Sequence, residues 1–167
     1  SGLIAKDDTK KKLADANIKL AGGKFETILK QGGLAAANAD LAKAKAEWER
    51  GGKQEAARAD IAYKEGLLAF YKAREANIAP TRGKDGAAQV KDVEGKLMKS
   101  EGDLQEIDAE IENLLEAASN SEITAGWKAE DRQKSENELR LAYAKKVIIT
   151  NEVNKLRGLA GKPPIKA

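Results

Sequence analysis

The sequence predicts an all-α protein, built as an elongated antiparallel helical hairpin or a three-helix coiled-coil rod that assembles into oligomers. Three observations predict this class. Alanine is prominent in a hydrophobic fraction of 41%, while charged residues reach 34% and aromatic residues only 4%, a composition typical of long helices. Only three prolines occur, Pro80, Pro163 and Pro164, so long stretches of backbone keep every amide donor. Apolar residues also recur with helical spacing.

The N-terminal segment, residues 1–33, is predicted to form short helices. Asp7, Asp8 and Thr9 are residue types suited to cap a helix N-terminus, and apolar residues follow them with helical spacing through Leu20.

Gly-Gly pairs interrupt the first third of the chain at three places. Each glycine costs a helix about 1 kcal/mol relative to alanine. We expect helix breaks at 22–23 and 32–33, while the pair at 51–52 is compatible with a break, a bend or close packing of the backbone.

Residues 34–118 are predicted to form a long antiparallel helical hairpin with its turn at 79–86. Pro80 ends the first helix, because the residue before a proline is driven away from helical backbone angles. Asp85 is suited to cap the second helix, which we expect over 87–118.

The second helix of this hairpin has the clearest coiled-coil pattern in the chain. Its two predicted core positions hold Val90, Leu97, Leu104, Ile111 and Ala118, and Val93, Ser100, Ile107 and Leu114. Eight of these nine residues are apolar, which favours a narrow helix-packing seam. Ser100 is the exception and predicts a thin point in the seam.

The richest apolar cluster lies in the first helix of the hairpin. It is wider than a two-helix seam requires, which predicts contact either with two neighbouring helices or with another subunit. The two tryptophans sit in polar stretches and are either packing anchors or contact residues. The predicted interaction surface comprises Ile61, Tyr63, Leu67, Leu68, Phe70, Tyr71, Trp48 and Trp127.

Residues 119–158 are predicted to form the third helix, and 159–167 an extended tail. Ser121 is suited to cap this helix and Gly158 to end it. Residues 128–138 contain almost no apolar side chain, so this part of the helix is expected to be solvated.

Charge is distributed unevenly around a net value of +3. Residues 91–116 hold nine acidic and three basic side chains, whereas 43–84 and 128–166 are both basic in balance. We therefore expect the acidic helix to pack beside basic neighbours, with complementary charges along the seam.

The chain has no cysteine and no histidine, so it lacks thiolate nucleophiles, the usual proton carrier near neutral pH and the commonest zinc ligands. No catalytic, cofactor-binding or metal site is predicted. Asp103, Glu106 and Glu110 share a helical face, but they flank an apolar seam and no calcium-loop motif accompanies them. We interpret them as solvated charges.

The stretch TRGKDGA places glycines beside a lysine ahead of a helix. A phosphate-binding loop requires a preceding strand and a Ser or Thr after the lysine, whereas Lys84 is followed by Asp85. Arg82, Lys84 and Asp85 are therefore predicted to form the tip of the hairpin, as a solvated turn or as a partner contact.

Nucleic-acid binding is disfavoured, because the basic residues at 10–12 and 145–157 stand in a chain with few aromatic stacking residues and many interspersed acids.

No apolar run is long enough for a transmembrane helix, and no signal peptide is visible. The sequence predicts a soluble protein. It does not specify a compartment, and it is compatible with a virion-associated or a secreted protein.

Two stretches resemble known helical hairpins. KAEDRQKSENEL and NKLRG, in their alanine- and lysine-rich setting, resemble the receptor-binding hairpins of nuclease colicins. LAAANADLAKAKAEWERGG is similar to the α-hairpins of bacterial membrane-fusion proteins, although the β halves that flank those hairpins have no counterpart here.

These observations predict a non-enzymatic structural or interaction subunit of a larger homo-oligomeric assembly, such as a virion, a tail or a secretion apparatus. The alternative, implied by the colicin resemblance, is a receptor-binding coiled-coil hairpin of a bacteriocin-like toxin that contacts its target through 79–86. A second alternative is a nucleic-acid-associated helical protein.

Overall fold

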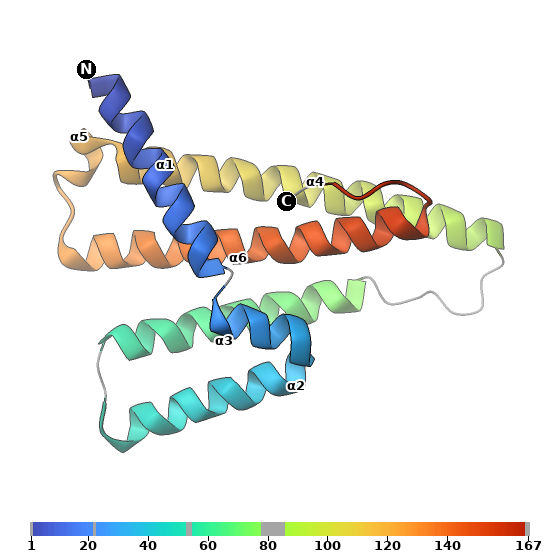
Figure 1. The fold of residues 1–167 in the computed structure, drawn as a ribbon, viewed down its shortest axis with the longest axis horizontal. Helices are drawn as coiled ribbons and strands as arrows, with labels where there is room; N and C mark the ends of the chain where they lie inside the picture. Colours follow the sequence, from blue (N-terminus) through green and yellow to red (C-terminus); the bar gives the residue numbers. More distant parts are fainter. Residues whose placement is uncertain (1, 22, 53–54, 78–85, 166–167) are drawn as a thin grey trace.

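The computed structural model describes residues 2–21, 23–52, 55–77 and 86–165, and all its elements are helical (Figure 1). They are α1 Gly2–Ala21, α2 Lys24–Glu47, the π-helical turn η1 Trp48–Gly52, α3 Glu55–Asn77, α4 Gly86–Ser119, α5 Ser121–Thr124 and α6 Ala129–Leu159. The described ranges contain no β-strand, and the all-α prediction is confirmed.

The helices form two packed groups. α4 and α6 run antiparallel and make the most extensive helix pair, and α1 crosses both of them (Figure 1). α2 and α3 pack on each other and meet the rest of the chain mainly where α3 lies against α6. At about 1.5 Å per residue, the 34-residue α4 is about 50 Å long, so the molecule is elongated along α4 and α6.

The helix pairing differs from the expected hairpin over 34–118. The segment 34–77 folds back on itself at η1, so α3 packs against α2 and α6, while α4 pairs with α6. The physical reason is that α3 is apolar on a broad face, which one neighbour cannot cover. The expected turn at 79–86 falls almost entirely outside the described residues, as do Arg82, Lys84 and Asp85.

The Gly-Gly pairs mark three changes of direction. α1 ends at Ala21 and α2 begins at Lys24, as expected for a break at 22–23. The second pair bends α2 internally, because Gly33 adopts a left-handed φ of 71°. A Cβ on Gly32 would lie 2.5 Å from the Cβ of Ala36, so the bend also needs a glycine there. The third pair lies at the reversal in η1.

Two predicted helix caps are wrong. α1 already begins at Gly2, so Asp7, Asp8 and Thr9 lie inside it. Asn120, rather than Ser121, caps α5, because its side chain accepts hydrogen bonds from the backbone amides of Glu122 and Ile123.

The predicted third helix is divided near its start. α5 ends at Thr124, and α6 begins only at Ala129, where the Asp131 carboxylate accepts a hydrogen bond of 2.9 Å from the Lys128 amide. An acidic group in the first turn satisfies one of the amides that a helix start leaves free.

The heptad pattern of α4 describes its packing well. Leu97, Ile107 and Ile111 are buried in the core, while Val90 remains 57% exposed near the start of the helix. The core extends through apolar residues of α6, namely Leu139, Ala142, Ile149, Val153 and Leu156.

The C-terminal residues fold back onto α6 rather than leaving as an extended tail. Gly161 has a left-handed φ of 74°, and the amides of Gly161 and Lys162 donate to the carbonyls of Gly158 and Arg157. These two hydrogen bonds form a Schellman motif. α6 therefore ends at Leu159, one residue beyond the predicted end at Gly158. Ile165 then exchanges two hydrogen bonds with the Asn154 side chain, at 2.7 and 3.1 Å.

Replacing Gly161 with alanine is expected to lower the free energy of unfolding by about 1–2 kcal/mol, because a side chain disfavours the left-handed conformation. Thermal or urea unfolding followed by circular dichroism measures this change. Gly158→Ala is the matched control: its added Cβ would meet nothing within 4 Å, so it should leave stability unchanged or raise it. Equal effects of Gly161→Ala and Gly158→Ala on stability would contradict the requirement for a left-handed glycine at position 161.

Candidate functional site

The predicted interaction cluster of α3 lies in the core of the chain itself. Tyr63, Leu67 and Leu68 are buried, and Ile61, Phe70 and Tyr71 pack around them half-buried. Of the two predicted explanations for this wide apolar cluster, contact with two neighbouring helices is the one observed, since α3 contacts both α2 and α6. These buried side chains are covered without any second subunit.

The two tryptophans are not brought together. Trp48 lies in η1, beside the α2–α3 pair, whereas Trp127 lies between α5 and α6, at the closed end of the α4–α6 hairpin (Figure 1). Both are half-buried. The eight residues of the predicted interaction surface therefore do not form one continuous patch.

A buried ionic network joins α3, α4 and α6. The Arg74 guanidinium donates to both carboxylate oxygens of Glu152, at 2.6 and 2.8 Å, and to the Asp103 carboxylate at 2.5 Å. The Ser100 hydroxyl donates to Glu152 at 2.7 Å. The side chains of Arg74 and Glu152 are only 11% and 5% exposed, so this pair is screened little by solvent.

The pKa of Arg74 reports the balance in this network. Burial alone would lower the pKa, but the hydrogen bonds to Glu152 and Asp103 outweigh it and raise the pKa above the ordinary value. The guanidinium is therefore held charged, with fixed geometry.

Ser100 explains the one polar position in the heptad of α4. It is 2% exposed, and it faces the Glu152 carboxylate across the α4–α6 seam. A larger apolar residue at this position could not donate the hydrogen bond, and the Glu152 oxygen that Ser100 shares with Arg74 would lose one of these two donors. The thin point predicted from the sequence is thus the place where the seam accommodates a buried charge.

A second polar cluster lies where α2, α3 and α6 meet. The Tyr63 hydroxyl donates a short hydrogen bond to Glu26, and the Arg140 guanidinium stacks 3.7 Å from the centre of the Tyr63 ring. Arg140 also donates to Asp60 at 3.2 Å. Burial, followed by the bond to Glu26, raises the pKa of Tyr63 above its ordinary value of 10.0.

The raised pKa of Tyr63 predicts a loss of stability in alkali. Above pH 10 the unfolded chain releases this proton while the folded chain retains it, so the free energy of unfolding falls as pH rises. The fall attributable to Tyr63 should approach about 1.4 kcal/mol per pH unit. Urea unfolding of the parent and of Tyr63→Phe between about pH 9 and pH 11 measures it. Parallel pH profiles of the two proteins would contradict this prediction.

The expected charge complementarity of α4 is confirmed. Its acidic side chains pair with basic residues of three other helices: Glu112 and Glu116 with Lys10 of α1, Asp103 with Arg74 of α3, Asp108 with Lys146 of α6, and Glu101 with Arg157 of α6. The half-buried Lys146 thus directs its charge to Asp108 at the edge of the α4–α6 seam.

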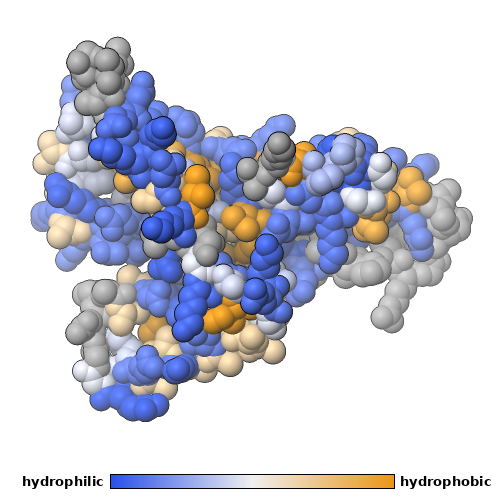
Figure 2. All heavy atoms as spheres, in the orientation of Figure 1, coloured by the Kyte–Doolittle hydropathy of each residue, from blue (hydrophilic) through white to orange (hydrophobic). Residues whose placement is uncertain are grey.

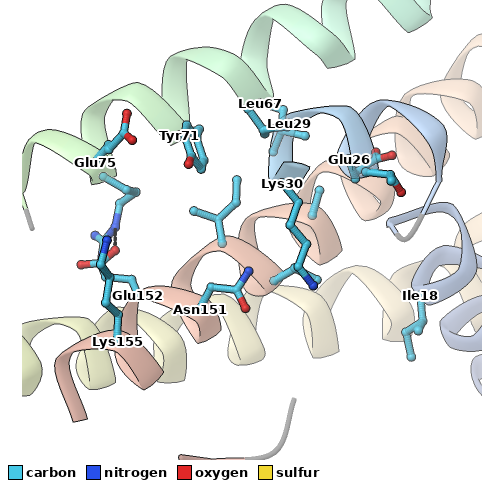
Figure 3. A pocket seen from close by; sticks show the side chains of 15 residues that line it. Ile18, Glu26, Leu29, Lys30, Leu67, Tyr71, Glu75, Asn151, Glu152 and Lys155 are labelled. Atoms are coloured by element: carbon cyan, nitrogen blue, oxygen red, sulfur yellow. Dashed lines mark hydrogen bonds and ion pairs between the residues drawn. The ribbon is translucent and has the colours of Figure 1, made fainter. Parts of the chain in front are cut away.

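A cavity of about 490 Å³ lies between the two groups of helices. Its lining includes the apolar residues Leu29, Leu67, Ala144 and Ile148, together with the ion-paired Arg74 and Glu152. Figure 3 shows α3 and α6 on opposite sides, with Lys30 of α2 reaching across the opening towards α6. Apolar atoms are also visible in Figure 2 near the hollow where the two groups meet, while much of the surrounding surface is hydrophilic.

The buried network of Ser100, Arg74 and Glu152 was not predicted from the sequence. Two signals were present: Ser100 stands alone as a polar residue in the α4 heptad, and Glu152 lies on the apolar face of α6 between Ile149 and Val153. Polar residues at matching depths of two paired helices indicate a buried polar contact. The contribution of α3 through Arg74 has no comparable signal.

Metal ligation finds no support in the described ranges, which contain no group of three or more acidic residues placed to hold a metal ion. Asp103 is occupied by Arg74, and Glu106 and Glu110 are exposed. No helix in the described part of the chain is long and apolar enough to cross a membrane.

The fold and these contacts define an all-helical protein with two packed helix groups and a buried ionic junction between them. No protein-family model, curated protein or solved structure matches the chain significantly. Its function is therefore argued from its own residues.

Proposed function

We propose that this chain is a non-enzymatic structural or interaction subunit that packs against further helices in a larger assembly. The observation that carries the proposal is an uncharged stripe on the outer face of α4. Its members are exposed and recur every three or four residues: Gly95, Met98, Gly102, Gln105 and Ala109.

This stripe has the spacing of a second helix-packing seam. Met98 is 78% exposed, and a Cβ added to Gly95 or Gly102 would meet nothing within 4 Å. Small residues around a single large apolar one let another helix approach closely. Acidic residues such as Glu94, Glu106 and Glu112 flank the stripe, which favours a partner helix with basic flanks.

Mass measurement by light scattering tests this proposal over a range of micromolar concentrations. We expect a species heavier than the 17.9 kDa chain, and Met98→Glu should reduce its mass towards the monomer. Val90→Glu is the matched control, since it places the same charge on α4 at another exposed apolar residue. A parent chain that remains monomeric would contradict self-assembly, and equal effects of both variants would exclude the stripe.

A receptor-binding hairpin is the second candidate, favoured by the antiparallel α4–α6 pair. The residues between these helices, 120–128, present Ile123 with 46% of its surface exposed, and the hairpin carries the stretch that resembles colicins. Binding of labelled protein to Gram-negative cells tests this function. Ile123→Asp should reduce binding if this end contacts the target, and Arg82→Ala with Lys84→Ala should do so if the segment 79–86 does. Unchanged binding in both cases would exclude the candidate.

A further inference from the structure

We propose that the cavity between α1, α2, α3 and α6 binds an uncharged amphipathic small molecule, of the class of aliphatic alcohols. The alkyl chain of this ligand lies against the apolar part of the lining, and its hydroxyl group bonds to uncharged polar side chains. The proposal is independent of the packing proposed for α4, because no residue of α4 lines the cavity.

The size and position of the cavity suit a small ligand. Its volume of about 490 Å³ falls within the roughly 300–1,000 Å³ that is usual for ligand pockets. All four helices contribute to its lining, so the cavity exists only while the α2–α3 pair is packed on α6. A ligand in the cavity therefore binds the docked chain and stabilises it.

Apolar side chains line the cavity at both buried and exposed positions. Leu29, Leu67 and Ala144 belong to the buried core. Ile18 of α1 and Val147 of α6 also line the cavity, yet they are 57% and 41% exposed. An alkyl chain in the cavity would cover part of these exposed surfaces, and removing apolar surface from water favours binding.

The charges of the lining balance each other. Its three acidic and three basic residues are Glu26, Glu75 and Glu152, and Lys30, Arg74 and Lys155. Glu152 and Arg74 form an ion pair. Glu26 keeps one buried carboxylate oxygen that has no hydrogen-bond partner in the described part of the chain, so the lining has no surplus of positive charge.

This balance favours an uncharged ligand over an ion. An anion or a cation that enters the cavity loses hydration, and no net opposite charge in the lining offsets this cost. An alcohol loses much less hydration free energy, because only one hydroxyl group has to exchange water for protein partners.

Two uncharged side chains offer hydrogen bonds to such a hydroxyl. In Figure 3, Tyr71 extends from α3 and Asn151 from α6 into the same space. Among the described residues, neither side chain has a hydrogen-bond partner. A tyrosine hydroxyl and an asparagine amide can each donate and accept, as an alcohol can, whereas a carboxylate only accepts and an ammonium only donates.

Calorimetric titration with 1-octanol tests the proposal. The comparison uses three ligands with the same octyl group and a charged head: the anion nonanoate, the cation octylammonium and the zwitterion 2-aminodecanoate. We expect saturable binding of one octanol per chain, and binding of each charged ligand that is weaker by about tenfold or more. Each methylene added between hexanol and octanol should tighten binding about threefold to fourfold.

A double variant locates the hydroxyl group. Tyr71→Phe combined with Asn151→Ala should weaken octanol binding about tenfold, because the ligand hydroxyl loses its partners in the protein. Tyr143→Phe combined with Asn113→Ala is the matched control, since both of these residues lie outside the lining, and it should leave binding unchanged. Methyl chemical shifts of Ala144 and Ile148 should change on addition of octanol, while those of Ile123 in α5 should not.

Several outcomes would overturn the proposal. They are an absence of saturable octanol binding, binding of any charged ligand as tight as that of octanol, and shift changes confined to methyl groups outside the lining. Equal effects of the two double variants would also overturn it, provided that circular dichroism shows a retained fold in both. The comparison of the four ligands needs no substitution, so it decides the question even if a variant fails to fold.

Discussion

Replacing Arg74 with methionine should lower the free energy of unfolding by about 3–5 kcal/mol. Without the guanidinium, the Glu152 carboxylate remains buried with the Ser100 hydroxyl as its donor. Removing one member of a buried pair is costly because the other charge stays desolvated. Urea unfolding followed by circular dichroism at neutral pH measures the loss.

Two controls separate this mechanism from a loss of packing. The double variant Arg74→Met and Glu152→Met should be more stable than Arg74→Met alone, because no buried charge is then left unpaired. Arg157→Met removes the ion pair with Glu101, whose side chain is 43% exposed, and should cost less than about 1 kcal/mol. A loss from Arg74→Met no greater than that from Arg157→Met would show that the buried network contributes little.

Leu67→Ala should cost about 2–5 kcal/mol of unfolding free energy. Leu67 is 1% exposed and lies in the core beneath the cavity, between α3 and its neighbours. Removing most of its side chain forfeits buried apolar area and leaves a void that rigid helices cannot fill. Thermal unfolding monitored at two protein concentrations measures the change without confusion from self-association.

This experiment also distinguishes core from contact surface. If Leu67 served chiefly to bind another subunit, its truncation would change association and leave the stability of the single chain almost unaltered. Leu159→Ala provides the reference for an exposed leucine, since Leu159 is 68% exposed. Its effect on stability should stay within about 0.5 kcal/mol.

Sequence reasoning succeeded where local chemistry decides the structure. The helix expected over 87–118 is observed as Gly86–Ser119, because its apolar heptad and its helix-forming surface residues agree. The pairing of its acidic residues with basic neighbours could be predicted because acidic and basic residues are concentrated in different segments of the sequence. Neither prediction required knowledge of which helix lies beside which.

The same reasoning failed where long-range packing decides the structure. The Gly-Gly pair at 32–33 gives no sign that α2 bends and continues, since the direction of the bend depends on what covers α3. The apolar pattern around Leu67 is equally compatible with a buried core and with a surface that contacts another subunit. The cavity depends on docking of the α2–α3 pair, which no local pattern specifies.

The bond between Arg74 and Glu152 also has a consequence for the order of folding. It joins residues 78 positions apart, whereas α4 and α6 are connected through only nine residues. The α4–α6 hairpin therefore has the smaller loop-closure entropy to overcome and should form first, with α3 docking later. Loss of the Arg74 contact should then appear mainly as faster unfolding, with the folding rate little changed.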